Sequence, residues 1–392
     1  MWRGKRRSAW GWHRGDPRMI RPGTDDQAVA LAAQCLRDGG LIGLPTETVY
    51  GLGADANNPT AVAKVFALKG RPSDHPLIVH VLSTAQVGEF AADVPEFARL
   101  LMAAFWPGPL TLILPRRPGV AQQAAGGQAT VGVRCPSHPV AQAVLQQALA
   151  LGVTGLAGPS ANRFGRVSPT NAAHVVQELG SDLLVLDGGA CEVGIESTIV
   201  DCRRGLPVLL RPGMLSLEAL SAAAGQTVWP MGSPDASSDQ GVLGAAGAHL
   251  TQPTPTADGP QAVAGKGLDA PAPKASGTLA AHYAPRATVR LLTIAQMQAR
   301  LGASSFPAQH HVAIWSRTAV LGPGVQHHPM PQSAALAAQM LFAWMRQCDD
   351  AGAVEIWVEH PPADAAWDGV RDRLQRAAAA ALAGTNGPSQ YR

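Results

Sequence analysis

The sequence lacks the patterns of membrane-spanning, secreted and metal-binding proteins. No run of about 18 apolar residues occurs, so neither a transmembrane helix nor a membrane partner is expected. The basic residues 1–18 precede no apolar core of the kind found in a signal peptide. The five cysteines are scattered and form no C-x-x-C pair, which indicates reduced thiols rather than a zinc or redox centre. These absences predict a cytoplasmic protein.

The common signatures of nucleotide binding and covalent catalysis are also missing. There is no G-x-x-x-x-G-K-[ST] loop, and Gly51-Leu52-Gly53 has no third glycine to complete a dinucleotide fingerprint. We find no nucleophilic triad and no metal-ligand spacing. The paired histidines His310-His311 and His327-His328 fall in expected loops without acidic partners, and we predict that they are solvated. Any nucleotide site must therefore be built in another way.

Length and composition predict a globular protein of two domains. The chain has 392 residues, of which 46% are hydrophobic and 15% charged. The 42 glycines and 32 prolines point to one unstructured stretch, and residues 225–273 are rich in small and polar residues. A net charge of +3 is too small to indicate nucleic-acid binding by itself.

Apolar runs alternate with helical patterns in both halves. In the first half, a helix should begin at Asn58-Pro59, and the short spacings between strands favour a twisted, mixed, open α/β sheet. Strands are expected there at residues 41–44, 77–82, 110–114, 130–134, 183–186, 197–200 and 208–211. In the second half, strands at 288–292, 312–315 and 354–358 alternate with helices, which predicts a smaller Rossmann-like domain.

Cations and small polar residues gather in loops that border the expected strands. Arginine forks and lysine ammonium groups suit phosphate and carboxylate oxygens, although each could also be a solvated surface charge. The cations are Lys69, Arg71, Arg134 and Arg211, and the polar residues are Thr46, Thr48, Ser160, Asn162, Ser168, Ser197 and Thr198. Turn or cap roles are the alternative for the polar group, and His75 and His80 could be structural. Together they indicate a polycationic cleft suited to adenylyl or phosphoryl transfer.

The order of the motifs resembles one family, the YrdC-type threonylcarbamoyl-AMP synthases. The motifs are PTETVYGLG (45–53), KGRPSDHPLIVH (69–80), WPGPLT (106–111), VRCPSHP (133–139), PSANRFGRVSPT (159–170), DGG (187–189), GIESTIVD (194–201) and LRPG (210–213). SGTLAAHYAP (276–285) resembles the element by which two-domain members close over the active site. The resemblance implies synthesis of threonylcarbamoyl-AMP and pyrophosphate from L-threonine, bicarbonate and ATP, for threonylcarbamoyl-adenosine modification of tRNA.

The resemblance also implies site residues and partners. It assigns catalysis to Lys69, Arg71 and Arg211. It assigns ATP to Lys69, Arg71, His75, Thr130, Ser160, Asn162, Ser168, Arg211 and His282, and threonine to Thr46, Thr48, His80, Arg134, Gly158 and Ser197. Mg²⁺ would be held mainly by ATP rather than by a protein metal site. The downstream partner would be the tRNA threonylcarbamoyl transferase machinery, with weak contact to tRNA itself.

Combined with the composition, the resemblance divides the chain into segments. We expect a basic arm without structure at 1–19, a YrdC-like catalytic domain at 20–216, a flexible linker at 217–275, a lid motif at 276–286 and a Rossmann-like domain at 287–386.

Two alternatives remain open at this level. The chain could be an RNA-binding module that uses a basic concave face, in which case binding would depend steeply on salt. It could also be a carbamoyltransferase of hydrogenase maturation, although the absence of C-x-x-C pairs argues against the companion zinc-finger modules.

Overall fold

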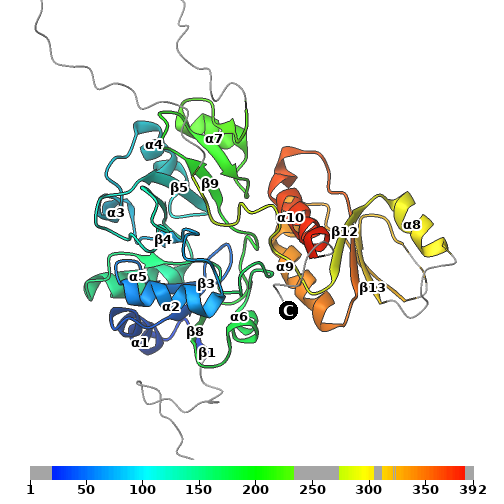
Figure 1. Cartoon of the computed structure of the whole chain (residues 1–392), viewed down its shortest axis with the longest axis horizontal. Coiled ribbons are helices and arrows are strands. Elements are labelled where there is room, and N and C mark those ends of the chain that lie inside the picture. Colours follow the sequence, from blue (N-terminus) through cyan, green and yellow to red (C-terminus); the bar gives the residue numbers. More distant parts are fainter. Residues whose placement is uncertain (1–19, 234–272, 304–310, 321, 323, 385–392) are drawn as a thin grey trace, which may run out of the picture.

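The computed structural model describes residues 20–233, 273–303, 311–320, 322 and 324–384 (Figure 1). The predicted basic arm at 1–19 and the part of the predicted linker at 234–272 lie outside these residues. We call residues 20–233 the N-terminal domain, residues 276–283 the lid segment, and the described residues from 287 to 384 the C-terminal domain. Figure 1 shows the two domains side by side, with the chain passing between them.

The N-terminal domain is built on a mixed sheet of 11 described strands in the order β1-β8-β2-β3-β7-β4-β6-β5-β9-β10-β11. Parallel pairs such as β4 with β6 alternate with antiparallel pairs such as β5 with β6, which confirms the predicted mixed sheet. The strands are β1 (Ile20–Pro22), β2 (Ile42–Leu44), β3 (Gly51–Asp55), β4 (Ile78–His80), β5 (Leu110–Pro115), β6 (Thr130–Arg134), β7 (Leu156–Ala157), β8 (Leu184–Asp187), β9 (Thr198–Asp201), β10 (Val208–Arg211) and β11 (Trp229–Pro230).

Helices cover this sheet and share its apolar core. They are α1 (Asp26–Arg37), α2 (Pro59–Lys69), α3 (Val87–Phe90), α4 (Glu96–Phe105), α5 (Pro139–Ala150), α6 (Ala172–Leu179) and α7 (Leu217–Ala224), with a 3-10 turn η2 (Thr84–Gln86). The expected start of α2 is confirmed, because Asn58 caps its first amides and Pro59 is its first residue. Gly70 ends α2 in the left-handed conformation, so the helix terminus places Lys69 and Arg71 on either side of a sharp turn.

The predicted linker boundary at residue 217 needs correction. Ser216 caps helix α7 through the amide of Ala219, and strand β11 extends the sheet beside β10. Leu220 and Ala224 are buried in the same core as Leu101 of α4, which gives this segment the apolar contacts that its composition did not reveal. The first domain therefore extends to at least β11.

The C-terminal domain has a smaller, parallel sheet of four described strands in the order β12-β15-β13-β14. Its elements are β12 (Thr288–Leu292), α8 (Ile294–Gly302), β13 (Val312–Ser316), β14 (Val325–Pro329), α9 (Ala334–Asp350), β15 (Glu355–Glu359), η4 (Ala365–Trp367) and α10 (Asp368–Gly384). Helices α9 and α10 lie on the side facing the first domain and α8 on the other (Figure 1). This arrangement confirms the predicted Rossmann-like α/β layering.

The expectation that His327-His328 lies in a solvated loop is wrong. Both residues belong to β14, where His327 Nε2 is 3.1 Å from Ser316 Oγ and the His328 ring lies 5.9 Å from that of Trp344. Of the other pair, His310 lies outside the described residues and His311 is half-buried. None of the helices within the described ranges is long and apolar enough to cross a membrane.

The two domains share a packed interface. Ile195 and Val167 of the first domain are buried in one apolar cluster with Phe342 and Leu374 of the second. A side chain at Gly194 would place its Cβ only 2.4 Å from the Cα of Gln339 in α9, and the φ of Gly194 is +78°. Glycine is therefore required where the loop before β9 meets α9.

Candidate functional site

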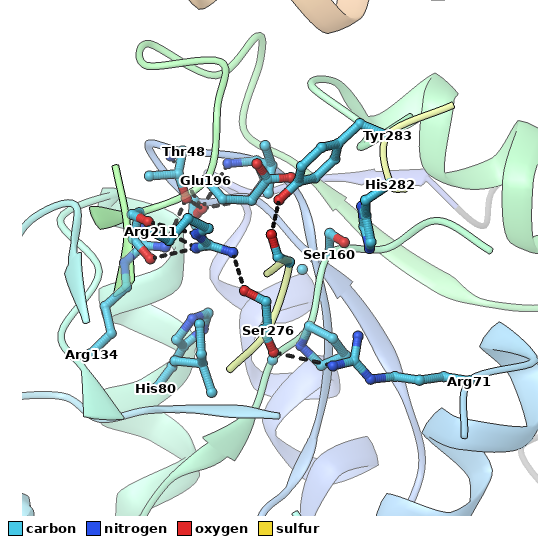
Figure 2. Close-up of a pocket in the computed structure, with 18 residues that line it drawn as sticks. Thr48, Arg71, His80, Arg134, Ser160, Glu196, Arg211, Ser276, His282 and Tyr283 are labelled. Atoms are coloured by element: carbon cyan, nitrogen blue, oxygen red, sulfur yellow. Dashed lines mark hydrogen bonds between the residues drawn. The ribbon is translucent and has the colours of Figure 1, made fainter. Parts of the chain in front are cut away.

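A cavity lies in the N-terminal domain beneath the lid segment (Figure 2). It is lined by Thr46, Thr48, Val49, Gly51, Arg71, Ile78, His80, Arg134, Gly158, Pro159, Ser160, Glu196, Ser197, Arg211, Ser276, Gly277, His282 and Tyr283. Most of these residues come from the ends of strands or from the loops that follow them. Figure 2 shows Arg134 and His80 on one side of the cavity and Arg71 on the other, with Arg211 and Ser276 between them.

Sheet register brings His80 and Arg134 together. They are Cα partners at the ends of the parallel strands β4 and β6, so their side chains leave the sheet on the same face. Arg134 Nη1 donates to Thr48 Oγ1 at 2.8 Å, and Thr48 Oγ1 lies 2.9 Å from Thr46 Oγ1. The motifs around residues 46, 80 and 134 thus form one polar group at one end of the cavity.

Glu47 pairs with Arg134, and sequence reasoning did not select it. Arg134 Nη2 lies 2.7 Å from Glu47 Oε1, and both side chains are about 5% exposed or less. These two atoms are in contact without hydrogen-bond geometry and have no other hydrogen-bond partner among the described residues. The sequence did offer a signal for Glu47, an acidic residue between two threonines in an otherwise apolar segment. A carboxylate buried in such a segment needs a cation as its partner.

The uncharged ring of His80 lines the same end of the cavity. Burial, followed by the charge of Arg134, lowers the pKa of His80 to about 3, so the ring is uncharged near neutral pH. Its Nδ1 has no hydrogen-bond partner in the described part of the chain. A Cβ on Gly158 would lie 2.6 Å from this nitrogen, so the glycine allows the backbone after β7 to approach the ring.

Arg71 and Arg211 form the cationic part of the cavity. Arg71 Nη2 donates to Pro76 O at 2.9 Å and to Ser276 Oγ at 3.3 Å. Arg211 donates to Ser197 O through Nε and Nη2, and to Ser276 O through Nη1 at 2.7 Å. Burial is the main cause that lowers the pKa of Arg71, to about 10, at which it remains charged at neutral pH, and burial also lowers the pKa of Arg211. Ser276 therefore accepts hydrogen bonds from both cations.

Of the other predicted ATP residues, Ser160 and His282 line the cavity, whereas Lys69, His75, Thr130, Asn162 and Ser168 do not. Lys69 Nζ donates to the carbonyls of Ser160 and Asn162, both at 2.5 Å, and burial lowers its pKa. The Asn162 amide donates to Arg163 O and Arg166 O. Thr130 begins β6 and is half-buried, while the His75 ring packs edge-on against Phe164 at 5.4 Å. Lys69 thus supports the loop that carries Ser160 and Asn162 beside the cavity, whereas Thr130, at the start of β6, is not part of the lining.

The lid segment covers the cavity with two aromatic rings. Burial lowers the pKa of His282 to about 3, and its ring lies 4.2 Å from that of Tyr283. Tyr283 is 1% exposed and has a φ of +61°, a left-handed conformation that costs a non-glycine residue about 1 kcal/mol or more. Packing against Phe342 of α9, at 5.4 Å between rings, accompanies this strained conformation. The lid is therefore fixed from the second domain.

Glu196 is the cavity carboxylate that sequence reasoning missed. Its Oε1 accepts from Ser168 Oγ, and its Oε2 lies 2.9 Å from Arg373 Nε of α10. Burial by itself would raise the pKa of Glu196, but the charges of Arg373 and Arg211 and the bond from Ser168 outweigh it and lower that pKa. An acidic residue inside the apolar motif GIESTIVD was the available signal.

The burial of the cations argues against the RNA-binding alternative. Arg71, Arg134 and Arg211 are 9%, 4% and 2% exposed, so they present no open face to a polymer backbone. Their setting, among hydroxyl groups beneath a lid, suits a small anionic ligand instead. No group of three or more histidine, cysteine, aspartate and glutamate side chains that could hold a metal ion occurs among the described residues.

Family models match both halves of the chain. Residues 34–213 match the Sua5_yciO_yrdC model, described as "Telomere recombination", and residues 247–379 match the Sua5_C model, described as "Threonylcarbamoyl-AMP synthase, C-terminal domain".

Individual relatives agree with these matches. The chain is 45% identical over 206 residues to the threonylcarbamoyl-AMP synthase of Bacillus subtilis. The matched region covers 52% of this chain but only 58% of that protein. It is 36% identical to a putative threonylcarbamoyl-AMP synthase of Mycobacterium tuberculosis, over 52% of this chain and 92% of that protein. The crystal structure of P. abyssi Sua5 complexed with L-threonine superposes with a TM-score of 0.73 at 31% identity, covering 91% of this chain and 96% of that one.

Proposed function

The chain belongs to the Sua5 and YrdC family of threonylcarbamoyl-AMP synthases, and from this premise we propose that it forms L-threonylcarbamoyl-AMP and pyrophosphate from L-threonine, bicarbonate and ATP. The observation that carries the proposal is the division of the cavity. A polar end built around Arg134 adjoins a cationic part built around Arg71 and Arg211. The charges of an amino acid and a triphosphate are complementary to the polar end and the cationic part respectively. The two ligands would therefore meet within one cavity.

The polar end suits the amino acid. Arg134 Nη2 and Glu47 Oε1 have unused hydrogen-bonding capacity beside Thr46 and Thr48. We assign the threonine carboxylate to Arg134, whose planar fork fits two oxygens. The neutral His80 and Gly158 would border the substrate side chain, and Ser197 lines the cavity beside Arg211, whose Nη2 donates to its Oγ at 3.2 Å.

The cationic part suits the phosphates. The amine of threonine would take up carbon dioxide derived from bicarbonate and lose a proton, giving a carbamate. A carbamate oxygen would then bond to the α-phosphorus of ATP while the bond to the β-phosphate bridging oxygen breaks, and pyrophosphate would leave with that electron pair. Lys69, Arg71 and Arg211 would stabilise the negative charge that develops. His75, Thr130, Ser160, Asn162, Ser168 and His282 would complete the ATP site.

Mg²⁺ enters the proposal with ATP. The cavity carboxylate of Glu196 is already in contact with Arg373 and Ser168, so it is not free to act as a ligand. This favours a metal held by phosphate oxygens and water, where it would offset phosphate charge.

Access for ATP requires movement of the lid segment. Ser276 contacts both Arg71 and Arg211 where the phosphates would bind. We infer that ATP displaces Ser276 and that the segment then closes over the nucleotide. Exclusion of water by His282 and Tyr283 would protect the carbamate anhydride from hydrolysis.

The product would be consumed by the tRNA threonylcarbamoyl transferase machinery, with weak contact between this chain and tRNA. A cytoplasmic location is part of the proposal. It is supported by the five cysteines, which are all free, as expected in a reducing compartment.

The decisive experiment is pyrophosphate release by the purified full chain with ATP, magnesium and bicarbonate. L-threonine is compared with L-serine, L-valine and no amino acid. Release that needs both threonine and bicarbonate is the expected result. Release that no amino acid stimulates would refute the proposed function.

A further inference from the structure

Helix α10 of the C-terminal domain places a buried arginine behind the residues that line the cavity. Arg373 is 0% exposed, although it belongs to a helix on the surface of the second domain that faces the first. Its Nε lies 2.9 Å from Glu196 Oε2, its Nη2 donates to Glu196 O at 3.0 Å, and its Nη1 donates to Pro212 O at 2.7 Å. One guanidinium thus joins the two loops that flank β9 and β10.

Those two loops hold the cation Arg211. Glu196 is followed by Ser197, whose carbonyl accepts from Arg211 Nε at 3.0 Å and from Nη2 at 2.8 Å. Pro212 directly follows Arg211 at the end of β10. Arg373 therefore fixes the backbone on both sides of the Arg211 side chain, without lining the cavity itself.

The same guanidinium contacts the lid segment. Its Cζ lies 5.4 Å from the ring centroid of Tyr283, within the range of a cation–π interaction. The neighbouring Arg376 accepts from the amide of His282 through its carbonyl at 3.2 Å and donates to Leu279 O. Helix α10 thus contacts both the lid segment and the loops of the cavity wall.

The charge balance explains why this pair must stay together. A buried carboxylate that loses its cation is strongly destabilised. Glu196 without Arg373 would either take up a proton or move, and its bond to Ser168 would change in both cases. The neighbouring Ser197 carbonyl, on which Arg211 depends, would move with it.

We propose that Arg373 is a positioning residue for the ATP site: through Glu196 and Pro212 it aims Arg211 at the phosphates, so that the C-terminal domain forms part of that site. The inference rests on the proposed function, because it assigns Arg211 to ATP. Arg346 of α9 offers a matched comparison. It is 5% exposed and also crosses the interface, to Glu178 and to the backbone carbonyls of Val167 and Ser168, and none of these three residues lines the cavity.

The test compares Arg373→Gln, Arg373→Lys and Arg346→Gln in the full chain. ATP and L-threonine affinities are measured separately by calorimetry, and melting temperatures are recorded for each variant. Arg373→Gln should weaken ATP binding roughly tenfold, the size of one or two charge-assisted hydrogen bonds, while threonine binding stays within about twofold. Arg373→Lys should fall between Arg373→Gln and the wild type, and Arg346→Gln should lower the melting temperature without this selective loss.

A double variant distinguishes positioning from simple destabilisation. Arg373→Gln combined with Glu196→Gln removes the unpaired buried charge, so stability should recover, while ATP binding should be no weaker than in the worse single variant. Equal loss of ATP affinity in the Arg373 and Arg346 variants, or additive losses in the double variant, would overturn the inference. Wild-type protein that binds ATP but releases no threonine-dependent pyrophosphate would overturn the proposed function alone. A wild type that does not bind ATP would overturn both.

Discussion

Replacing Gly277 with alanine should loosen the lid segment. Gly277 has a φ of +71°, where an alanine is disfavoured by about 1–2 kcal/mol. The added Cβ would lie 2.3 Å from Tyr283 Oη and 2.7 Å from Arg211 Nη1, closer than carbon atoms approach these groups. Tyr283 is buried against Phe342 and has little room to yield. The strain falls on the closed lid alone, because an open segment is free to choose another φ.

The size of the effect follows from that strain. About 1–2 kcal/mol shifts the ratio of closed to open lid by roughly 5- to 30-fold, before the contacts with Tyr283 and Arg211 add to it. Because Ser276 occupies the cations in the closed state, ATP alone should bind more tightly to Gly277→Ala than to the wild type. Pyrophosphate release should continue while less threonylcarbamoyl-AMP survives, because water reaches the anhydride.

The assay measures the ratio of pyrophosphate released to intermediate recovered, together with the affinity for ATP. Gly225→Ala is the matched control. Its φ is +67°, and an added Cβ would have only Leu100 Cδ1, at 3.9 Å, as a near neighbour. It carries the same backbone strain at the end of α7, away from the cavity. If Gly277→Ala matches Gly225→Ala in both quantities, the reasoning about the lid is refuted.

Three further predictions concern the polar end of the cavity. Arg134→Lys should weaken threonine binding about tenfold and spare ATP, because lysine keeps the charge near Glu47 but loses the fork that also reaches Thr48; calorimetry showing equal losses would contradict this assignment. Gly158→Ala should raise the KM for threonine more than that for ATP, since its Cβ would lie 2.6 Å from His80 Nδ1; unchanged amino-acid kinetics would rule out this wall. Burial lowers the pKa of His80 to about 3, so the unfolded chain, with a pKa near 6.5, binds a proton that the folded chain excludes, and stability falls as the pH drops from about 6.5 towards 3. The free energy of unfolding, measured with urea, should fall by about 2 kcal/mol less between pH 6.5 and 5 in His80→Gln than in the wild type. Identical decreases would show that His80 is not the group responsible.

Local signals in the sequence were enough for much of the fold. Asn58-Pro59 predicted the start of α2 because capping and the fixed φ of proline act over a few residues. Apolar runs likewise indicated most of the strands, and their spacing indicated the mixed sheet. Strand β3 was missed because glycines at positions 51 and 53 lie within it, and α7 was missed because its alanine-rich segment has few large apolar residues. In both cases tertiary packing outweighs local preference.

The candidate site divides in the same way. Short local motifs drew attention to Arg71, Arg134 and Arg211, since cations beside glycine or proline at strand ends can be recognised within one short segment. Which groups these cations touch was decided only by the tertiary structure. Glu47 and Arg134 meet because β4, β6 and the loop after β2 converge, and no local pattern specifies that convergence.

The link between the domains was the least accessible from sequence. Glu196 and Arg373 are 177 positions apart and belong to different domains, yet they form a buried pair beside the cavity. The local elements and the chemical types of the site residues can be predicted from the chain, because they depend on neighbouring residues. The charge partners and the position of the lid depend on surfaces that exist only once both domains have folded and packed together, so they had to be read from the structure.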